Sequence, residues 1–175
     1  MGRSGTLWAF QQWGIKPDLI TAAKGLGGGL PIGVMVAAEP YADLLQPGDH
    51  ASTFGGNPVV CAAAIAVLKI INEPKFLAGV TAMGQQMKTF FAEAARIQPD
   101  LIAGYRGLGL IAALELQEPV AKKVQERCTA AGLLINAIGD KILRFLPPLN
   151  IDAAELDEGL KIINNILTDI IKEEI

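Results

Sequence analysis

Lys24 stands where a short apolar segment meets a run of glycines, in the sequence Thr21-Ala-Ala-Lys24-Gly-Leu-Gly-Gly-Gly29. A lysine at the mouth of a buried strand is desolvated, which disfavours the ammonium form and leaves a neutral amine part of the time. A neutral amine can attack a carbonyl group and form a Schiff base. The alternative is an ordinary lysine that extends from a strand end into solvent. The glycines favour the first interpretation, because they leave little side-chain bulk beside the amine.

Two adjacent hydroxyl side chains, Ser52 and Thr53, precede a Gly55-Gly56 turn and the helix start Asn57-Pro58. Hydroxyl groups beside a flexible glycine turn can approach phosphate oxygens closely. An ordinary Ser/Thr turn ahead of a helix cap would give the same pattern without any ligand. The motif alone leaves both interpretations open.

Arg144 lies in a short apolar segment, between Ile142-Leu143 and Phe145-Leu146. A charge in such a strand needs a partner, and the planar guanidinium group matches a carboxylate in bidentate fashion. The alternative is an arginine that points out of an edge strand into solvent. The sequence therefore offers Arg144 as a candidate carboxylate anchor.

The composition excludes several classes of protein. The chain has 175 residues, of which 51% are hydrophobic and 19% charged, so a large core is feasible and intrinsic disorder is not expected. No apolar run reaches the roughly 18 residues that a membrane span needs, and no signal peptide is seen at the N-terminus. The net charge is −3 and the basic residues are scattered, which argues against nucleic-acid binding. We expect a cytoplasmic protein.

The sequence does not indicate a metal site, a serine-type hydrolase or a nucleotide-binding loop. His50 is the only histidine, and Cys61 and Cys128 lie far apart, so a metal site is not expected. We expect the two cysteines to be buried free thiols in a reducing compartment. A phosphate-binding P-loop has its lysine after the glycines, whereas Lys24 precedes them. The dinucleotide fingerprint fails because Leu30 occupies its last glycine position.

The elements that must position Lys24 are short and apolar. Asn57-Pro58 is a strong helix start, because a capping side chain precedes a proline at the first helical position. The following helix is apolar on nearly every side, so we expect it to be buried. The pattern predicts short helices at 7–13 and 39–45, buried strands at 18–23 and 31–38, a loop at 25–29, and helices at 57–72 and 76–97.

The second half of the chain reads as a compact α+β unit around Arg144. Asp152-Ala-Ala-Glu155 is a capping box, and the helix after it carries an apolar stripe at four-three spacing. Gly132 is expected to cap the helix before it. The pattern predicts strands within 102–116, a helix at 119–131, strands at 133–138 and 142–146, and a last helix with the stripe Leu156, Leu160, Ile163, Leu167 and Ile170.

Four segments in this order form a combination typical of one family: the Lys24 segment, His50-Ala-Ser-Thr-Phe-Gly-Gly-Asn-Pro58, Arg106-Gly-Leu-Gly109 and Leu143-Arg-Phe-Leu-Pro-Pro-Leu149. The chain resembles the class III pyridoxal-phosphate aminotransferases along its whole length, and within them most closely the acetylornithine group. The resemblance implies an α/β fold, in which the C-terminal part of a fold type I large domain is followed by a small α+β domain.

The resemblance also implies roles for four residues. Lys24 would be the catalytic lysine that holds pyridoxal 5′-phosphate covalently and moves a proton at the substrate carbon. Thr53, supported by Ser52, would bind the phosphate of the cofactor that is held mainly by the neighbouring subunit. Arg144 would bind the substrate carboxylate. A homodimer with composite active sites follows, with a small-molecule amino donor and 2-oxoglutarate as partners, whereas Arg106 is expected to be structural.

The chain resembles the C-terminal half of such an enzyme. The resemblance implies further cofactor contacts, among them a phosphate loop, an aromatic residue on the ring and an aspartate at the pyridine nitrogen, that precede Met1. Residues 1–75 would be part of the large domain, 76–100 a connecting helix and 101–175 the small domain. We expect no transaminase activity from the isolated chain, together with exposed apolar faces on residues 18–38 and on the Asn57 helix.

The reaction that the resemblance implies is transfer of the amine of N-acetylornithine to 2-oxoglutarate, in arginine biosynthesis. The products would be N-acetylglutamate semialdehyde and glutamate. Ornithine, N-succinyldiaminopimelate, succinylornithine and 4-aminobutyrate are rival amines. The alternative of a different class is a non-catalytic remnant or association module.

Overall fold

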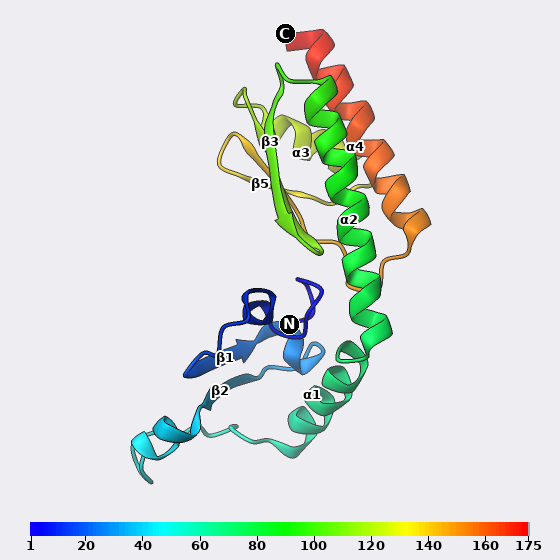
Figure 1. Cartoon of the computed structure of the whole chain (residues 1–175). Helices are drawn as coiled ribbons and strands as arrows, with labels where there is room; N and C mark the ends of the chain where they lie inside the picture. The colour runs from blue at the N-terminus through cyan, green and yellow to red at the C-terminus, as the bar shows by residue number, and fades with distance from the viewer. Residues whose placement is uncertain (175) are drawn as a thin grey trace. The chain divides into compact units, whose positions relative to one another are not determined.

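The computed structural model describes residues 1–174, and the chain divides into two compact units. Unit 1 comprises Met1–Gly2 and Thr6–Leu77, and unit 2 comprises Arg3–Gly5 and Ala78–Ile175. Figure 1 shows the elements of both units along the chain. None of the helices in the described part of the chain combines the length and the hydrophobicity that a bilayer crossing requires.

Unit 1 contains a two-stranded antiparallel sheet and a helix. Strand β1 (Leu19–Ala23) pairs with β2 (Gly33–Ala37), with Ala23 opposite Gly33 at the end where Lys24 follows. Short 3-10 helices occupy Ala9–Trp13 (η1), Lys24–Gly27 (η2) and Glu39–Leu44 (η3), and α1 spans Pro58–Ile71. The expected strands and helices are confirmed, but the expected loop at 25–29 is wrong, because its first residues form η2.

Asn57 caps α1 as the sequence predicts. Its side-chain Oδ1 accepts hydrogen bonds from the backbone amides of Val59 (3.0 Å) and Val60 (3.3 Å), and Pro58 occupies the first helical position, where a missing N–H has no cost. The cap therefore fixes where the helix begins, directly after the Ser52–Gly56 loop.

The burial predicted for the strands and the helix of unit 1 is not met within the described chain, which leaves exposed the apolar faces expected of a partial domain. In α1 only Ala64 is buried, while Val59 is 69% exposed and Ile70 59% exposed. In the sheet, Leu19 and Val36 are more than half exposed as well. A two-stranded sheet with one helix beside it lacks the layers needed to enclose apolar residues on every side. The expected exposure of the apolar faces of residues 18–38 and of the Asn57 helix is confirmed.

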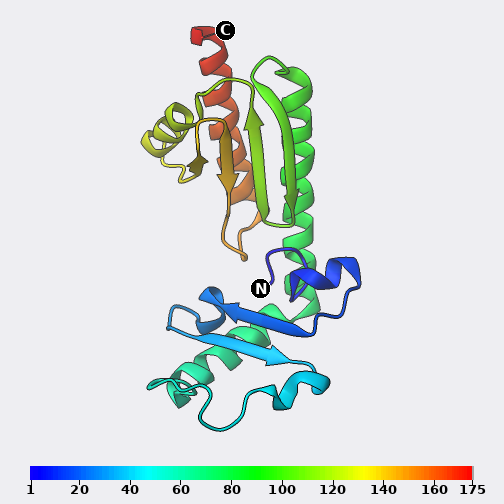
Figure 2. The same cartoon turned by 90° about the vertical axis from the view of Figure 1, so that its left-hand side faces the viewer.

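Unit 2 holds the main hydrophobic core. Its sheet has the strand order β3-β4-β6-β5, with all neighbours antiparallel. The strands are β3 (Ile102–Leu108), β4 (Ile111–Leu116), β5 (Asn136–Ile138) and β6 (Ile142–Phe145). The helices are α2 (Pro74–Ile97), α3 (Ala121–Ala130) and α4 (Ala153–Glu174), and in Figures 1 and 2 α2 and α4 run side by side along one face of the sheet.

Helix α4 closes the core in the way its sequence predicts. The backbone N–H of Asp152 donates to a Glu155 carboxylate oxygen (3.2 Å), and the Asp152 carboxylate accepts from the amides of Ala154 and Glu155, so the capping box is confirmed. The residues of the stripe are all buried: Leu156, Leu160, Ile163, Leu167 and Ile170. Their spacing places them on one face of the helix, which packs into the core.

An aromatic cluster ties α2 to the sheet beside Arg144. The Phe91 ring is fully buried, and its centroid lies 4.7 Å from that of Phe145 on β6 and 5.5 Å from that of Tyr105 on β3. Such ring pairs contribute beyond the area they bury. Phe145, the residue after Arg144 on β6, is therefore held against α2.

Candidate functional site

Lys24 has a strained backbone. It follows β1 directly and opens η2, and its φ of 56° lies in the left-handed region. Among residues 1–174 it is the only residue other than glycine with a positive φ. That conformation costs a non-glycine residue about 1–2 kcal/mol, and such strain gathers at functional sites. The strained position coincides with the lysine that the sequence singles out.

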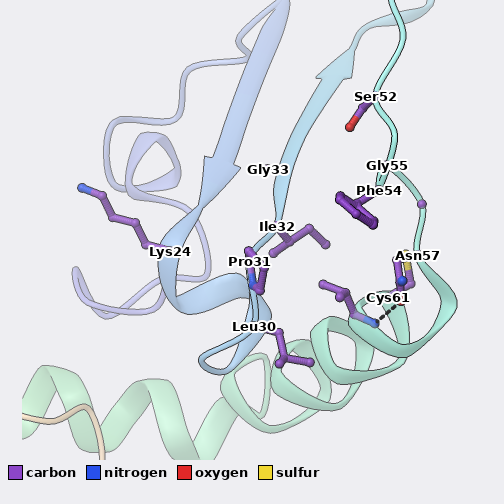
Figure 3. A pocket seen from close by; sticks show the side chains of 12 residues that line it. Lys24, Leu30, Pro31, Ile32, Gly33, Ser52, Phe54, Gly55, Asn57 and Cys61 are labelled. Carbon is purple, nitrogen blue, oxygen red and sulfur yellow. Dashed lines mark hydrogen bonds between the residues drawn. The ribbon is translucent and has the colours of Figure 1, made fainter.

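The Lys24 side chain is exposed, so the expected desolvation of this lysine is wrong for the chain described. Figure 3 shows the ammonium group extending away from the labelled side chains of Ser52 and Phe54. The physical reason is the small size of the sheet. Only β1 and β2 lie at this position, so no further strand of the described chain flanks the end of β1.

Lys24 nevertheless lines a pocket of about 670 Å³. One wall is the segment that leads into β2. The opposite wall is the loop before α1 together with the first turn of α1, as Figure 3 shows. The volume falls within the range of about 300–1,000 Å³ that is typical of small-molecule sites. The lining residues are Lys24, Leu30, Pro31, Ile32, Gly33, Ser52, Phe54, Gly55, Gly56, Asn57, Val60 and Cys61.

The two predicted hydroxyl residues differ in their placement. Ser52 lines the pocket together with Lys24, whereas Thr53 is not among the lining residues and is exposed. Gly55 makes the loop tight: its amide donates to the Ser52 carbonyl (3.3 Å), and an added Cβ there would lie 3.0 Å from the Ser52 Cβ. The structure therefore brings Ser52, but not Thr53, into the pocket of Lys24.

Cys61 is a pocket residue that the sequence motifs did not single out. It is half-buried with a free thiol, and it lines the pocket one helical turn after Asn57. The expectation of two buried thiols is confirmed for Cys128, whose burial raises its pKa to about 11, but not for Cys61. The i, i+4 spacing from the capping residue would have indicated a shared face of α1.

The pocket has donors suited to a phosphorylated aromatic aldehyde. Lys24, whose amine extends outward, and the hydroxyl-bearing Ser52 line it beside the Phe54 ring and the apolar side chains of Leu30 and Val60. None of the described lining residues is acidic, so no carboxylate in this part of the chain is placed to pair with a ring nitrogen. The residue types present therefore fit the aldehyde and phosphate ends of such a group, and Lys24 would have to turn inward to reach the aldehyde.

Arg144 lies on β6 in unit 2, opposite Ala113 on β4 and Asn136 on β5. Its Nη2 donates to the Asn136 Oδ1 (3.3 Å), and its Nε is buried without a hydrogen-bond partner in the described chain. A buried charged donor left unpaired costs about 1–3 kcal/mol or more. A carboxylate that accepts hydrogen bonds from Nε and a terminal nitrogen would satisfy this group.

Arg106 has a partner of its own. Its Nε lies 3.0 Å from the Glu115 Oε1 on the neighbouring strand, and both side chains are exposed. Exposed ion pairs of this kind contribute about 0–1 kcal/mol. The contact is the structural one expected for this arginine.

The family profile described as aminotransferase class III matches residues 1–167. The chain belongs to this family. Class III aminotransferases are pyridoxal-phosphate enzymes, so the predicted fold class, family and cofactor are confirmed.

Similar proteins agree with this assignment. The acetylornithine aminotransferase of Thermosynechococcus vestitus is 44% identical over 173 residues, which is 97% of this chain and 42% of that protein. The crystal structure of acetylornithine aminotransferase from Elizabethkingia anophelis has a TM-score of 0.89 at 30% identity, covering 96% of this chain and 43% of that one.

A further solved structure is the ornithine aminotransferase of Toxoplasma gondii, reported with partial occupancy of pyridoxal phosphate at its active site. It has a TM-score of 0.92 at 28% identity, covering 98% of this chain and 41% of that one. The chain thus spans about two fifths of the length of the relatives it matches.

Proposed function

We propose that the protein containing this chain transfers the amine of N-acetylornithine to 2-oxoglutarate, giving N-acetylglutamate semialdehyde and glutamate in arginine biosynthesis. The observation that carries the proposal is Lys24, a strained lysine on a ligand-sized pocket in a class III aminotransferase chain. The relatives named acetylornithine aminotransferase support the choice of amine.

Lys24 and the loop before α1 have separate roles in this proposal. Pyridoxal phosphate, when bound, supplies the electron sink that stabilises negative charge on the substrate carbon. Lys24 Nζ would hold the cofactor, and its amine would carry a proton at the substrate carbon as a general base and acid. Thr53, supported by Ser52, would bind phosphate oxygens of the cofactor of the neighbouring subunit through its hydroxyl group.

Arg144 is the substrate anchor in this proposal. Its unpaired Nε and its Nη2, which Asn136 orients, form the two-donor fork that a carboxylate accepts. 2-Oxoglutarate carries a carboxylate directly on its reacting carbon, whereas the carboxylate of N-acetylornithine is on Cα, away from the Cδ that bears the transferred amine. Arg144 is proposed to bind a substrate carboxylate.

The isolated 175 residues are proposed to be inactive and to need further protein. The exposed apolar side chains on α1, among them Val59 and Ile65, and on β2, among them Met35, support this, because they form a surface suited to burial against protein. Residues 1–75 then belong to the cofactor-binding large domain and 101–175 to the small domain. The active form is proposed to be a homodimer with composite sites. A cytoplasmic location is proposed as well, which the free thiols of Cys61 and Cys128 support.

The test is a substrate panel on the protein that contains this chain, with glutamate formation as the measurement. We expect the highest kcat/KM for N-acetylornithine, ahead of ornithine, succinylornithine, N-succinyldiaminopimelate and 4-aminobutyrate. A higher kcat/KM for another of these amines would replace the proposed donor. Absence of turnover with all of them, despite bound cofactor, would favour a non-catalytic role. Clear turnover by the 175 residues alone would contradict the proposed inactivity.

A further inference from the structure

Arg3 lies in unit 2, although the residues on both sides of Arg3–Gly5 lie in unit 1. Its Nη1 donates to two carbonyl oxygens, those of Leu110 (2.8 Å) and Pro147 (2.7 Å). Its own carbonyl accepts from the Leu110 amide (2.8 Å). Arg3 is thus bound to the β3–β4 turn through both its side chain and its backbone. The same side-chain nitrogen, Nη1, also binds it to the segment after β6.

The position of Arg3 is fixed by close packing of backbone on backbone. Gly109 has a φ of 55°, and a Cβ there would overlap the Arg3 carbonyl oxygen. A Cβ on Gly84 of α2 would in turn lie 2.5 Å from the Gly109 Cα. Both glycines are therefore needed for the chain to pass here, and Arg3 has little room to move.

The Arg3 guanidinium is partly buried and its described partners are carbonyl groups rather than a carboxylate. Desolvation lowers the pKa of Arg3, yet arginine keeps its charge at neutral pH. A charged donor makes stronger hydrogen bonds to carbonyl oxygens than a neutral one does. The link from Leu110 to Pro147 is therefore a firm one.

Pro147 follows Arg144 by three residues, and the segment between them is held at both ends. Phe145 is packed against Phe91, while Arg3 holds the Pro147 carbonyl. A shift of Pro147 would change the path on which the chain leaves β6, three residues after Arg144. Small displacements of a binding group have large kinetic effects, up to about 100-fold for about 1 Å.

We propose that Arg3 is a positioning residue for substrate carboxylate binding, which it supports by fixing the Leu146–Pro147 segment and thereby Arg144. This inference rests on the proposed role of Arg144. Arg3 touches no substrate in this scheme. It acts through the geometry of β6 and its exit.

The experiment is a double-mutant cycle in the active protein, with Arg3→Ala, Arg144→Ala and the combination. KM and kcat are measured for N-acetylornithine and for an alkyl amine without a carboxylate. We expect Arg3→Ala to raise KM for the carboxylate substrate about tenfold, with kcat little changed and KM for the alkyl amine unchanged. In the Arg144→Ala background the same substitution has no further effect on KM.

Arg106→Ala is the matched control, because it removes an exposed arginine of the same unit whose partner is Glu115. It should leave both KM values unchanged. Arg3→Lys keeps the charge and one donor group, so its KM for N-acetylornithine should lie between those of the wild type and Arg3→Ala. Arg3→Lys also replaces Arg3→Ala in the cycle if Arg3→Ala does not fold. If Arg3→Ala changes KM equally in the wild-type and Arg144→Ala backgrounds, or equally for both amines, the proposed role of Arg3 is overturned while the proposed role of Arg144 stands. An unchanged KM in Arg144→Ala would overturn the role of Arg144 and the inference with it.

Discussion

Gly109→Ala is expected to destabilise unit 2 far more than Gly132→Ala, although both positions have positive φ. Gly132 has a φ of 84° and no atom within 4 Å of an added Cβ, so alanine adds only backbone strain of about 1–2 kcal/mol. Alanine at position 109 would have the same backbone strain. Its Cβ would also meet the Arg3 carbonyl oxygen and the Ser4 carbonyl carbon, the latter at 2.9 Å. Overpacking of this kind adds about 1–3 kcal/mol.

The Arg3 hydrogen bonds to Leu110 and Pro147 also depend on this packing, and each is worth about 0.5–1.5 kcal/mol, or more for a charged donor. We therefore expect Gly109→Ala to reduce the free energy of unfolding of unit 2 by about 3–5 kcal/mol. The suitable assay is urea-dependent hydrogen exchange of the β3 and β4 amides. Tryptophan fluorescence would report on unit 1 instead, because Trp8 and Trp13 both lie there.

Equal losses of stability in Gly109→Ala and Gly132→Ala would refute this reasoning. Such a result would mean that Arg3 and the β3–β4 turn do not pack as closely as the structure has them. The proposed link from Arg3 to Pro147 would then lose its support.

Three further predictions concern other parts of the chain. Because burial raises the pKa of Cys128 to about 11, its contribution to stability is complete below pH 9 and is lost as the pH rises towards 11; urea unfolding should show a fall of roughly 2 kcal/mol, absent in Cys128→Val. Asp152→Ala should lower the free energy of unfolding by about 1 kcal/mol, against less than about 0.5 kcal/mol for Asp157→Ala, which breaks an exposed pair with Lys161. Iodoacetamide should modify Cys61 before Cys128, as mass spectrometry of the peptides would show, and bound pyridoxal phosphate should slow the reaction at Cys61.

Local sequence signals predicted most of the elements correctly. The Asn57 cap and the Asp152–Glu155 capping box are satisfied by atoms within four residues, so the sequence contains everything that sets these helix starts. The α4 stripe is likewise a property of spacing. The predicted strand at 133–138 is wrong in its first half, because β5 begins only at Asn136 and Leu134 is 83% exposed. Apolar character alone does not supply the pairing partner that a strand needs.

The candidate site was predictable in its residue types but not in its geometry. Lys24 and Ser52 line one pocket, although the resemblance assigns Ser52, as a support for Thr53, to the cofactor of the neighbouring subunit. The exposure of Lys24 was not predictable, because burial depends on how many strands flank β1. Arg3 gave no signal in the sequence, since its partners, Leu110 and Pro147, are more than a hundred residues away. Long-range contacts of this kind follow from the fold and not from local spacing.

The central claim is that Lys24 carries the cofactor. The most direct test is to incubate the protein that contains this chain with pyridoxal phosphate, reduce it with borohydride and map the peptides by mass spectrometry. We predict a phosphopyridoxyl group on Lys24 and its loss in Lys24→Ala, with Lys16 unmodified as an internal control. Modification of another lysine at full occupancy, or none at Lys24, would contradict the account.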